Sequence, residues 1–105
     1  MIRVKFLVGN RQLQGFEIKG HAMFAQSGED VVCAAVSSAA YMAANTVTEV
    51  IKVNANAEAD DGRMILMLEK ANEKTETVLR GLELHLTELS KQYPENIKII
   101  YGGVK

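Results

Sequence analysis

The segment from Asp30 to Lys52 constrains the fold more than any other part of the chain, because it contains neither glycine nor proline. Its larger apolar residues recur at helical spacing, and its first half is so rich in alanine that it is nearly apolar all round. Ser27, three residues before Asp30, resembles the start of a capping box. The segment therefore predicts a long central helix that packs closely on several sides.

Alternating apolar residues before this helix predict a pair of strands. The pattern runs from Ile2 to Val8, and Gly9-Asn10 then supplies the residues of a turn. A second extended segment, from Leu13 to Ile18, is expected to pair back as a hairpin, and Gly15 interrupts its alternation. We expect a β-bulge at that glycine.

Two strands, a helix and a last strand are predicted after the central helix. Asp61-Gly62 is typical of a tight turn between a strand from Val53 and a return strand over Met64–Glu69. Asn72 is a plausible cap for a helix with one apolar stripe that ends at Pro94, and Asn96–Tyr101 reads as a strand. The order β-β-α-β-β-α-β predicts an α+β fold with a largely antiparallel sheet and two helices, formed by a single domain over residues 1–105.

The return strand of the second hairpin is apolar on both faces. One face carries Met64, Leu66 and Leu68, and the other carries Ile65 and Met67. Such a strand is either covered on both sides or contributes to an oligomer contact. We expect a homodimer.

Charge and hydropathy narrow the classes of partner. The net charge of −1 and the pI near 6.1 leave no overall electrostatic attraction to a nucleic acid backbone, so no direct nucleic-acid partner is expected and any RNA contact would have to be local or indirect. The N-terminal residues lack the apolar run of a signal peptide, and no later window is expected to approach a membrane span. A cytoplasmic protein without a membrane partner is the default expectation.

Cys33 and His21 are the candidate catalytic pair. Cys33 is the only cysteine and His21 is one of two histidines, so we expect no disulfide, no metal site and no cofactor. A cysteine near a helix N-terminus meets free N–H groups and the positive end of the helix dipole, which favour thiolate and could also stabilise an oxyanion. His21 lies in a predicted loop from Gly20 to about Glu29 and could act as the base. Glu29 and the neighbouring Asp30 oppose thiolate formation unless they cap the helix or hold His21.

Structural explanations compete with this catalytic one. A lone cysteine in an alanine-rich helix is often a small core residue, and a lone loop histidine is usually surface. Ser37, one turn after Cys33, could bond the sulfur, His21 or a substrate, but a serine in mid-helix often bonds back to the helix. A redox-sensing thiol would need a resolving cysteine from another molecule. His85 is expected to be exposed and uninvolved.

Two short motifs favour the catalytic interpretation. Gly20-His21-Ala22 is followed by Gly28 and then by Asp30-Val31-Val32-Cys33-Ala34 and Ser37. This arrangement resembles the ribosomal-processing cysteine protease family called Prp, whose pattern is GHA, a short loop, G-x-D-[IV]-V-C-A, and a serine four residues after the cysteine. The likeness also covers the length of the chain and the order of its elements.

The resemblance implies a cytoplasmic endopeptidase and a role for each motif residue. Its partner would be a ribosomal protein precursor peptide, since the family removes an N-terminal extension from the twenty-seventh protein of the large ribosomal subunit, cutting after an aromatic residue. Cys33 would be the nucleophile and His21 its base, with Asp30 and Ser37 as supporting groups and Gly20 as a hinge of the loop. It also implies a homodimer with a mobile loop over the site, and we hypothesise that bound peptide orders this loop. The alternative is a non-catalytic ribosome-assembly or peptide-binding module.

Overall fold

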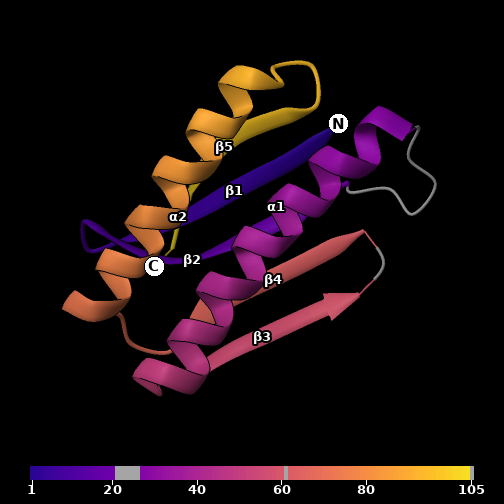
Figure 1. Ribbon diagram of the computed structural model, residues 1–105. Coiled ribbons are helices and arrows are strands. Elements are labelled where there is room, and N and C mark those ends of the chain that lie inside the picture. The colour runs from indigo at the N-terminus through magenta and orange to yellow at the C-terminus, as the bar shows by residue number, and fades with distance from the viewer. Residues whose placement is uncertain (21–26, 61, 105) are drawn as a thin grey trace.

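A five-stranded sheet covered by helices on one face forms the protein (Figure 1). The structure is a computed structural model and describes residues 1–20, 27–60 and 62–104. The predicted α+β class and the order β-β-α-β-β-α-β are confirmed. The elements are β1 (Ile2–Gly9), β2 (Gln12–Lys19), α1 (Ser27–Asn45), a π-helical turn η1 (Thr46–Ile51), β3 (Ala55–Asp60), β4 (Arg63–Leu68), α2 (Glu73–Gln92) and β5 (Ile97–Gly103).

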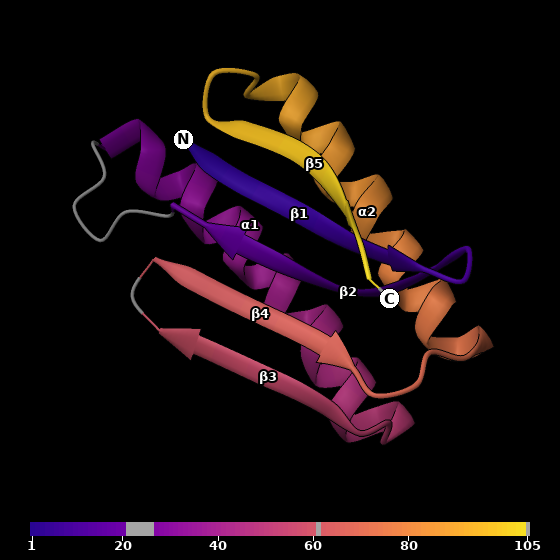
Figure 2. The same ribbon diagram turned by 180° about the vertical axis from the view of Figure 1, so that it is seen from behind.

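The strands lie in the order β3-β4-β2-β1-β5. The β1–β2, β2–β4 and β3–β4 pairs are antiparallel, and β5 joins the sheet parallel to β1. Both α-helices pack on the same face, and Figure 2 shows the opposite face with no helix over it. The sheet therefore presents one face to the core, and the described residues leave its other face uncovered.

The core lies between the sheet and the two helices. Phe6, Phe16 and Leu66 project from the sheet and are fully buried against Val36 of α1 and Leu79 of α2. Complete burial of an apolar side chain of this size contributes roughly 1.5–3 kcal/mol. The alternation of buried and exposed residues along β1 follows directly from this one-sided packing.

The β-bulge predicted at Gly15 is present. The register between β1 and β2 shifts at Leu7 and Val8, and Gly15 has a φ of 154°. A Cβ atom on Gly15 would collide with the carbonyl oxygen of Leu66 in the neighbouring strand. Glycine is required here because the two backbones approach too closely for any side chain.

The central helix begins earlier than the sequence predicts. The expectation of a loop as far as Glu29 is wrong at its end, because Ser27, Gly28 and Glu29 are already helical. A glycine inside a helix costs about 1 kcal/mol.

The end of the central helix widens into a π-helical turn. The hydroxyl groups of Thr46 and Thr48 donate to carbonyl oxygens four residues earlier, at 2.7 and 3.1 Å. Such back-bonding competes with the regular helical pattern. Lys52 then adopts a left-handed conformation with a φ of 64° and donates its N–H to the carbonyl oxygen of Val47, which ends the helix.

The hydropathy of the central helix corrects one expectation. The stretch Val31–Ile51 is long and apolar enough to cross a membrane by length and composition, with a hydropathy of 1.3, so the prediction that no window approaches a span is wrong. In the structure, one side of this stretch serves the core: Val32, Val36, Ala40 and Val47 are buried against the sheet, whereas Val31, Met42 and Val50 are exposed.

The second helix begins at the predicted cap. Asn72 accepts a hydrogen bond from the N–H of Thr75 at 2.9 Å, and the hydroxyl of Thr75 accepts the N–H of Asn72 at 2.8 Å. This reciprocal pair is a capping box with threonine in the usual place of glutamate. The predicted stripe is confirmed where Leu79, Leu82 and Leu86 are buried.

Candidate active site

Cys33 lies in the second turn of α1, on one flank of the helix. Its side chain is half-buried and packs against the core, whereas Val32 and Val36 beside it are buried completely. A cysteine that served only as core filling would be expected to be enclosed as fully as these valines. The partial exposure leaves the sulfur accessible to a reactant.

The early start of α1 changes the surroundings of Cys33. The unpaired N–H groups of a helix belong to its first four residues, here 27–30. Side chains on a helix lean toward its N-terminus, so the sulfur is directed toward this first turn. The dipole acts mainly within that turn, so the helix terminus offers a thiolate at Cys33 less stabilisation than the sequence alone suggests.

Asp30 and Ser37 follow the spacing of one helix face. Asp30 precedes Cys33 by three residues and Ser37 follows it by four, and the structure places all three positions in α1. Residues three and four apart on a helix are neighbours. Ser37 is half-buried like Cys33. The backbone therefore brings three of the predicted site positions to one flank of α1.

His21 lies outside the residues that the structure describes, as does most of the predicted loop. The pairing of His21 with Cys33 and the ordering of the loop by peptide stay predictions. The described chain reaches Gly20 on one side of the loop and resumes with α1 on the other, at one end of the sheet (Figure 2).

Gly20 has a geometry that only glycine tolerates well. Its φ is 89°, and a Cβ atom there would collide with the carbonyl oxygen of Met1. Its N–H donates to the carbonyl oxygen of Gly62 at 2.9 Å. This hydrogen bond joins the end of β2 to the turn that precedes β4, and the hinge that the resemblance implies at Gly20 stays a prediction. The sequence did not reveal Gly62 as a partner, although its Asp-Gly turn signal predicted the turn itself.

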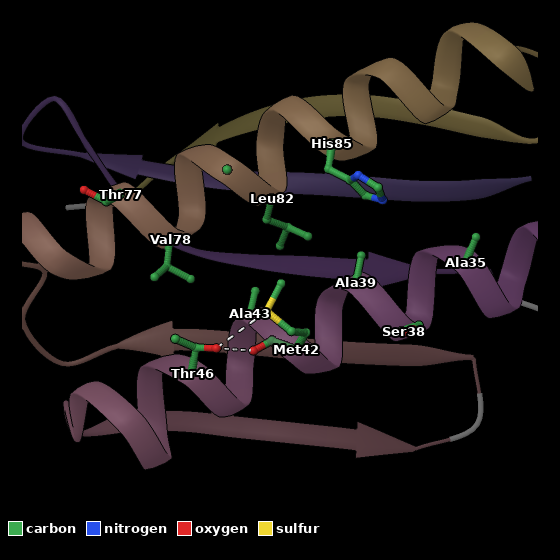
Figure 3. Close-up of a pocket in the computed structure, with 11 residues that line it drawn as sticks. Ala35, Ser38, Ala39, Met42, Ala43, Thr46, Thr77, Val78, Leu82 and His85 are labelled. Carbon is green, nitrogen blue, oxygen red and sulfur yellow. Dashed lines mark hydrogen bonds between the residues drawn. The ribbon is translucent and has the colours of Figure 1, made fainter.

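A groove of about 670 Å³ runs between α1 and α2 (Figure 3). Its lining is mostly apolar and small, with Met42 and Ala43 facing Val78 and Leu82 across it. His85 is among the residues that line the groove, and its exposure agrees with the prediction from the sequence. Neither Cys33 nor Ser37 lines this groove, so His85 belongs to a different surface from the candidate nucleophile.

Among the described residues, two groups with displaced pKa values lie on α2 and β5. The hydrogen bond to Glu83 raises the pKa of Tyr101, and burial and the charge of Glu83 add to that effect. The same carboxylate raises the pKa of Arg80 through a hydrogen bond. Within residues 1–20, 27–60 and 62–104, no group of three or more His, Cys, Asp or Glu side chains is arranged to hold a metal ion.

The sequence and the fold match one family. Residues 1–98 match the family model described as cysteine protease Prp. The ribosomal processing cysteine protease Prp of Bacillus subtilis (strain 168) is 24% identical over 97 residues, which cover 86% of this chain and 87% of the relative.

Solved structures agree with this match. The crystal structure of SMU.848 from Streptococcus mutans has a TM-score of 0.88 and 26% identity, and covers 99% of both chains. The essential ribosomal processing protease Prp from S. aureus in complex with a substrate peptide has a TM-score of 0.88 at 22% identity, covering 97% of this chain and 100% of that one. The same protease with a covalently linked product peptide has a TM-score of 0.84.

Proposed function

This chain belongs to the cysteine protease Prp family, and we propose that it is an endopeptidase that removes the N-terminal extension of a ribosomal protein precursor, the twenty-seventh protein of the large subunit. The observation that supports this most is the half-exposed Cys33 on the flank of α1, with Asp30 and Ser37 at neighbouring helical positions. The relative from B. subtilis is a ribosomal processing protease, and the S. aureus protein binds a substrate peptide.

The proposed chemistry is acyl transfer through a thioester. His21 takes the proton of the Cys33 thiol, the sulfur attacks the carbonyl carbon of the scissile bond, and negative charge develops on the carbonyl oxygen. As the tetrahedral intermediate collapses, the C–N bond breaks and His21 gives that proton to the leaving amine, which is the new N-terminus of the mature protein. Water then attacks the thioester while His21 takes a proton from it, the C–S bond breaks, and the extension leaves with a free carboxylate as the proton on His21 returns to the sulfur.

The supporting residues act on this pair rather than on the scissile bond. Asp30 has the charge to hold an imidazolium at His21 in place, because opposite charges attract strongly at short range. Ser37 offers a hydroxyl one turn after Cys33 that can bond the sulfur or the substrate. Gly20 fixes the end of β2 from which the segment carrying His21 departs.

A homodimer and a cytoplasmic location complete the proposal. Residues 31–48 of α1 and η1 carry no charged side chain, and Val31, Tyr41 and Met42 are 64%, 48% and 64% exposed. The centres of protein interfaces are depleted of charge, so a second copy with the same uncharged surface is a suitable partner. Ile65 and Met67 of β4 are half-buried on the uncovered face of the sheet and offer less exposed surface.

Cleavage of a purified precursor tests the function. The wild-type protein is expected to shorten a precursor that carries the extension and to leave the mature form unchanged. Cys33→Ala should abolish cleavage and Cys33→Ser should leave a trace at most, because a hydroxyl ionises far less readily than a thiol. Ser38→Ala is the matched control, since Ser38 is exposed on the same helix and lines the groove instead. Binding of the precursor without cleavage would favour the peptide-binding module.

A measurement of mass in solution tests the dimer. Light scattering coupled to size exclusion is expected to give twice the monomer mass for the wild type. Met42→Glu should reduce the measured mass to that of the monomer, since an unpaired carboxylate buried in the dimer interface is costly. A monomeric wild type would remove the dimer from the proposal and leave the catalytic part intact.

A further inference from the structure

Basic side chains form a continuous row across the uncovered face of the sheet. Arg63 lies opposite Lys19, Lys19 lies opposite Arg3, and Arg3 lies opposite Lys98 in the strand register. The residues beside them in sequence, Met64, Ile18, Ile2 and Ile97, are buried against the helices. Because side chains alternate along a strand, the four basic groups all project from the opposite, uncovered face. We name these four residues the basic row.

The row is located at the end of the sheet where the candidate active site begins. It combines the starts of β1, β4 and β5 with the end of β2, and these strand ends gather where α1 starts (Figure 2). Lys19 directly precedes the anchored Gly20. The basic row and the segment that carries the proposed base are therefore neighbours at one end of the molecule.

Among the described residues, acidic side chains compensate only the Arg63 end of the row. Glu17 accepts from Arg63 at 2.9 and 3.0 Å and lies 3.8 Å from Lys19, and Asp60 lies opposite Arg63 in the register. Within the described part of the chain, no ion pair is formed by Arg3 or Lys98, and both are exposed. Like charges directly opposite each other destabilise a sheet. The pair formed by Arg3 and Lys98 therefore suits an external anion.

The form of the row indicates which anion fits. Neighbouring strands are about 4.8 Å apart, so the four charges extend in a line of roughly 14 Å. A line of positive charges suits a polymer with a regularly charged backbone. No aromatic side chain among the described residues projects from this face to stack on a base: Phe6 and Phe16 are buried on the helix side, and Tyr101 bonds to Glu83 of α2. Contact would involve the phosphate backbone and not base identity.

We propose that the basic row binds the phosphate backbone of single-stranded RNA, and so holds the protease on RNA beside a precursor bound to it. RNA is chosen over an acidic protein because the proposed substrate is a ribosomal protein, and to that extent the inference rests on the proposed function. The net charge of −1 argued against attraction over the whole surface. The row is a local exception, since it concentrates basic groups on one face.

Fluorescence anisotropy with a short labelled single-stranded RNA of mixed sequence tests the proposal. The double variant Arg3→Gln with Lys98→Gln is expected to weaken binding roughly tenfold for all sequences alike. The slope of log K against log salt should fall in magnitude by about 1.4, because each phosphate contact to a single strand contributes about 0.7. Lys70→Gln with Lys74→Gln is the matched control, since it removes equal charge from exposed positions next to the start of α2. Its affinity should match the wild type.

Equal affinity of the two double variants would overturn the proposal. Tighter binding of a polyglutamate peptide than of RNA would also overturn the proposal, because the basic row would then favour an acidic protein. Cleavage of a free precursor without RNA is the separate measurement of function. RNA binding that fails while this cleavage persists contradicts only the basic row, and lost cleavage with intact RNA binding contradicts only the proposed function.

Discussion

The N–H of Gly20 donates to the carbonyl oxygen of Gly62 at 2.9 Å, which ties the end of β2 to the turn before β4. This bond fixes the point at which the segment containing His21 leaves the sheet. Gly20, the residue before the proposed base His21, is thus bonded to the neighbouring turn, and the proposed nucleophile Cys33 lies on a helix packed against that same sheet. The sheet thus supports the two chain segments on which the proposed catalytic residues depend.

Replacing Gly20 tests the need for this anchor. Gly20→Ala should destabilise the protein by about 1–2 kcal/mol, because alanine resists a positive φ and its Cβ meets the Met1 carbonyl. Urea unfolding measures the loss, and cleavage should fall more steeply than stability. Gly81→Ala is the matched control, since a Cβ at Gly81 has nothing within 4 Å and should stabilise α2 by up to about 1 kcal/mol. If Gly20→Ala were neutral, glycine would not be required at this position.

Glu76 links the second helix to the first hairpin. Its Oε1 accepts the N–H of Leu13 at 2.9 Å and lies 3.3 Å from Nε of Arg80. Glu76→Ala leaves the N–H of Leu13 without this acceptor and should cost about 1–3 kcal/mol. Glu76→Gln keeps an oxygen acceptor in place and should cost less than half as much. Thermal unfolding compares the two variants, and equal losses would show that charge rather than the hydrogen bond matters.

The hydrogen bond of Tyr101 should make the stability of the fold depend on pH in the alkaline range. Its hydroxyl donates to Glu83 at 2.7 Å, which raises its pKa above the ordinary value of 10.0. The folded state then holds the proton more tightly than the unfolded state. The stabilisation is complete below pH 10 and is lost as the pH rises through the folded pKa. Urea unfolding should show Tyr101→Phe less stable than wild type at pH 8, with the difference shrinking above pH 10; a constant difference would contradict this linkage.

The basic row should reduce stability in the absence of its ligand. Arg3 has basic neighbours on both adjacent strands, Lys19 and Lys98. Arg3→Gln should therefore raise the free energy of unfolding by a few tenths to about 1 kcal/mol at low salt, and less at high salt. Lys70→Gln serves as the control and should change little. A destabilised Arg3→Gln would mean that the row contributes to folding instead.

Local patterns in the sequence predicted most of this fold. Features that depend on pairing between distant segments could not be predicted. The cap at Asn72 depends on residues close in sequence, and a local break in the alternation of β2 indicated the bulge at Gly15; both were predicted correctly. The start of α1 at Ser27 was not, because Gly28 is a poor helix residue and local propensity therefore argues against a helix there. The basic row could not be predicted, because it depends on the register of strands that are far apart in sequence. The net charge of the whole chain gives no sign of such a local cluster.

In the candidate site, too, the local features were predicted and the long-range ones were not. Motif resemblance indicated Cys33, Asp30 and Ser37, and helical spacing is enough to bring these positions together. The partner of Gly20 depends on where β2 and β4 end, which no local pattern specifies. The pairing of His21 with Cys33 stays a prediction.

Mass spectrometry of an acid-quenched reaction tests the central claim, that Cys33 attacks the scissile carbonyl. Cys33 is the only cysteine of the chain, so an acyl intermediate has one expected position. The predicted result is the mass of the precursor's N-terminal extension attached to the peptide that contains Cys33, together with no cleavage by Cys33→Ala. An adduct on a different side chain, or cleavage by Cys33→Ala at the wild-type rate, would contradict the claim.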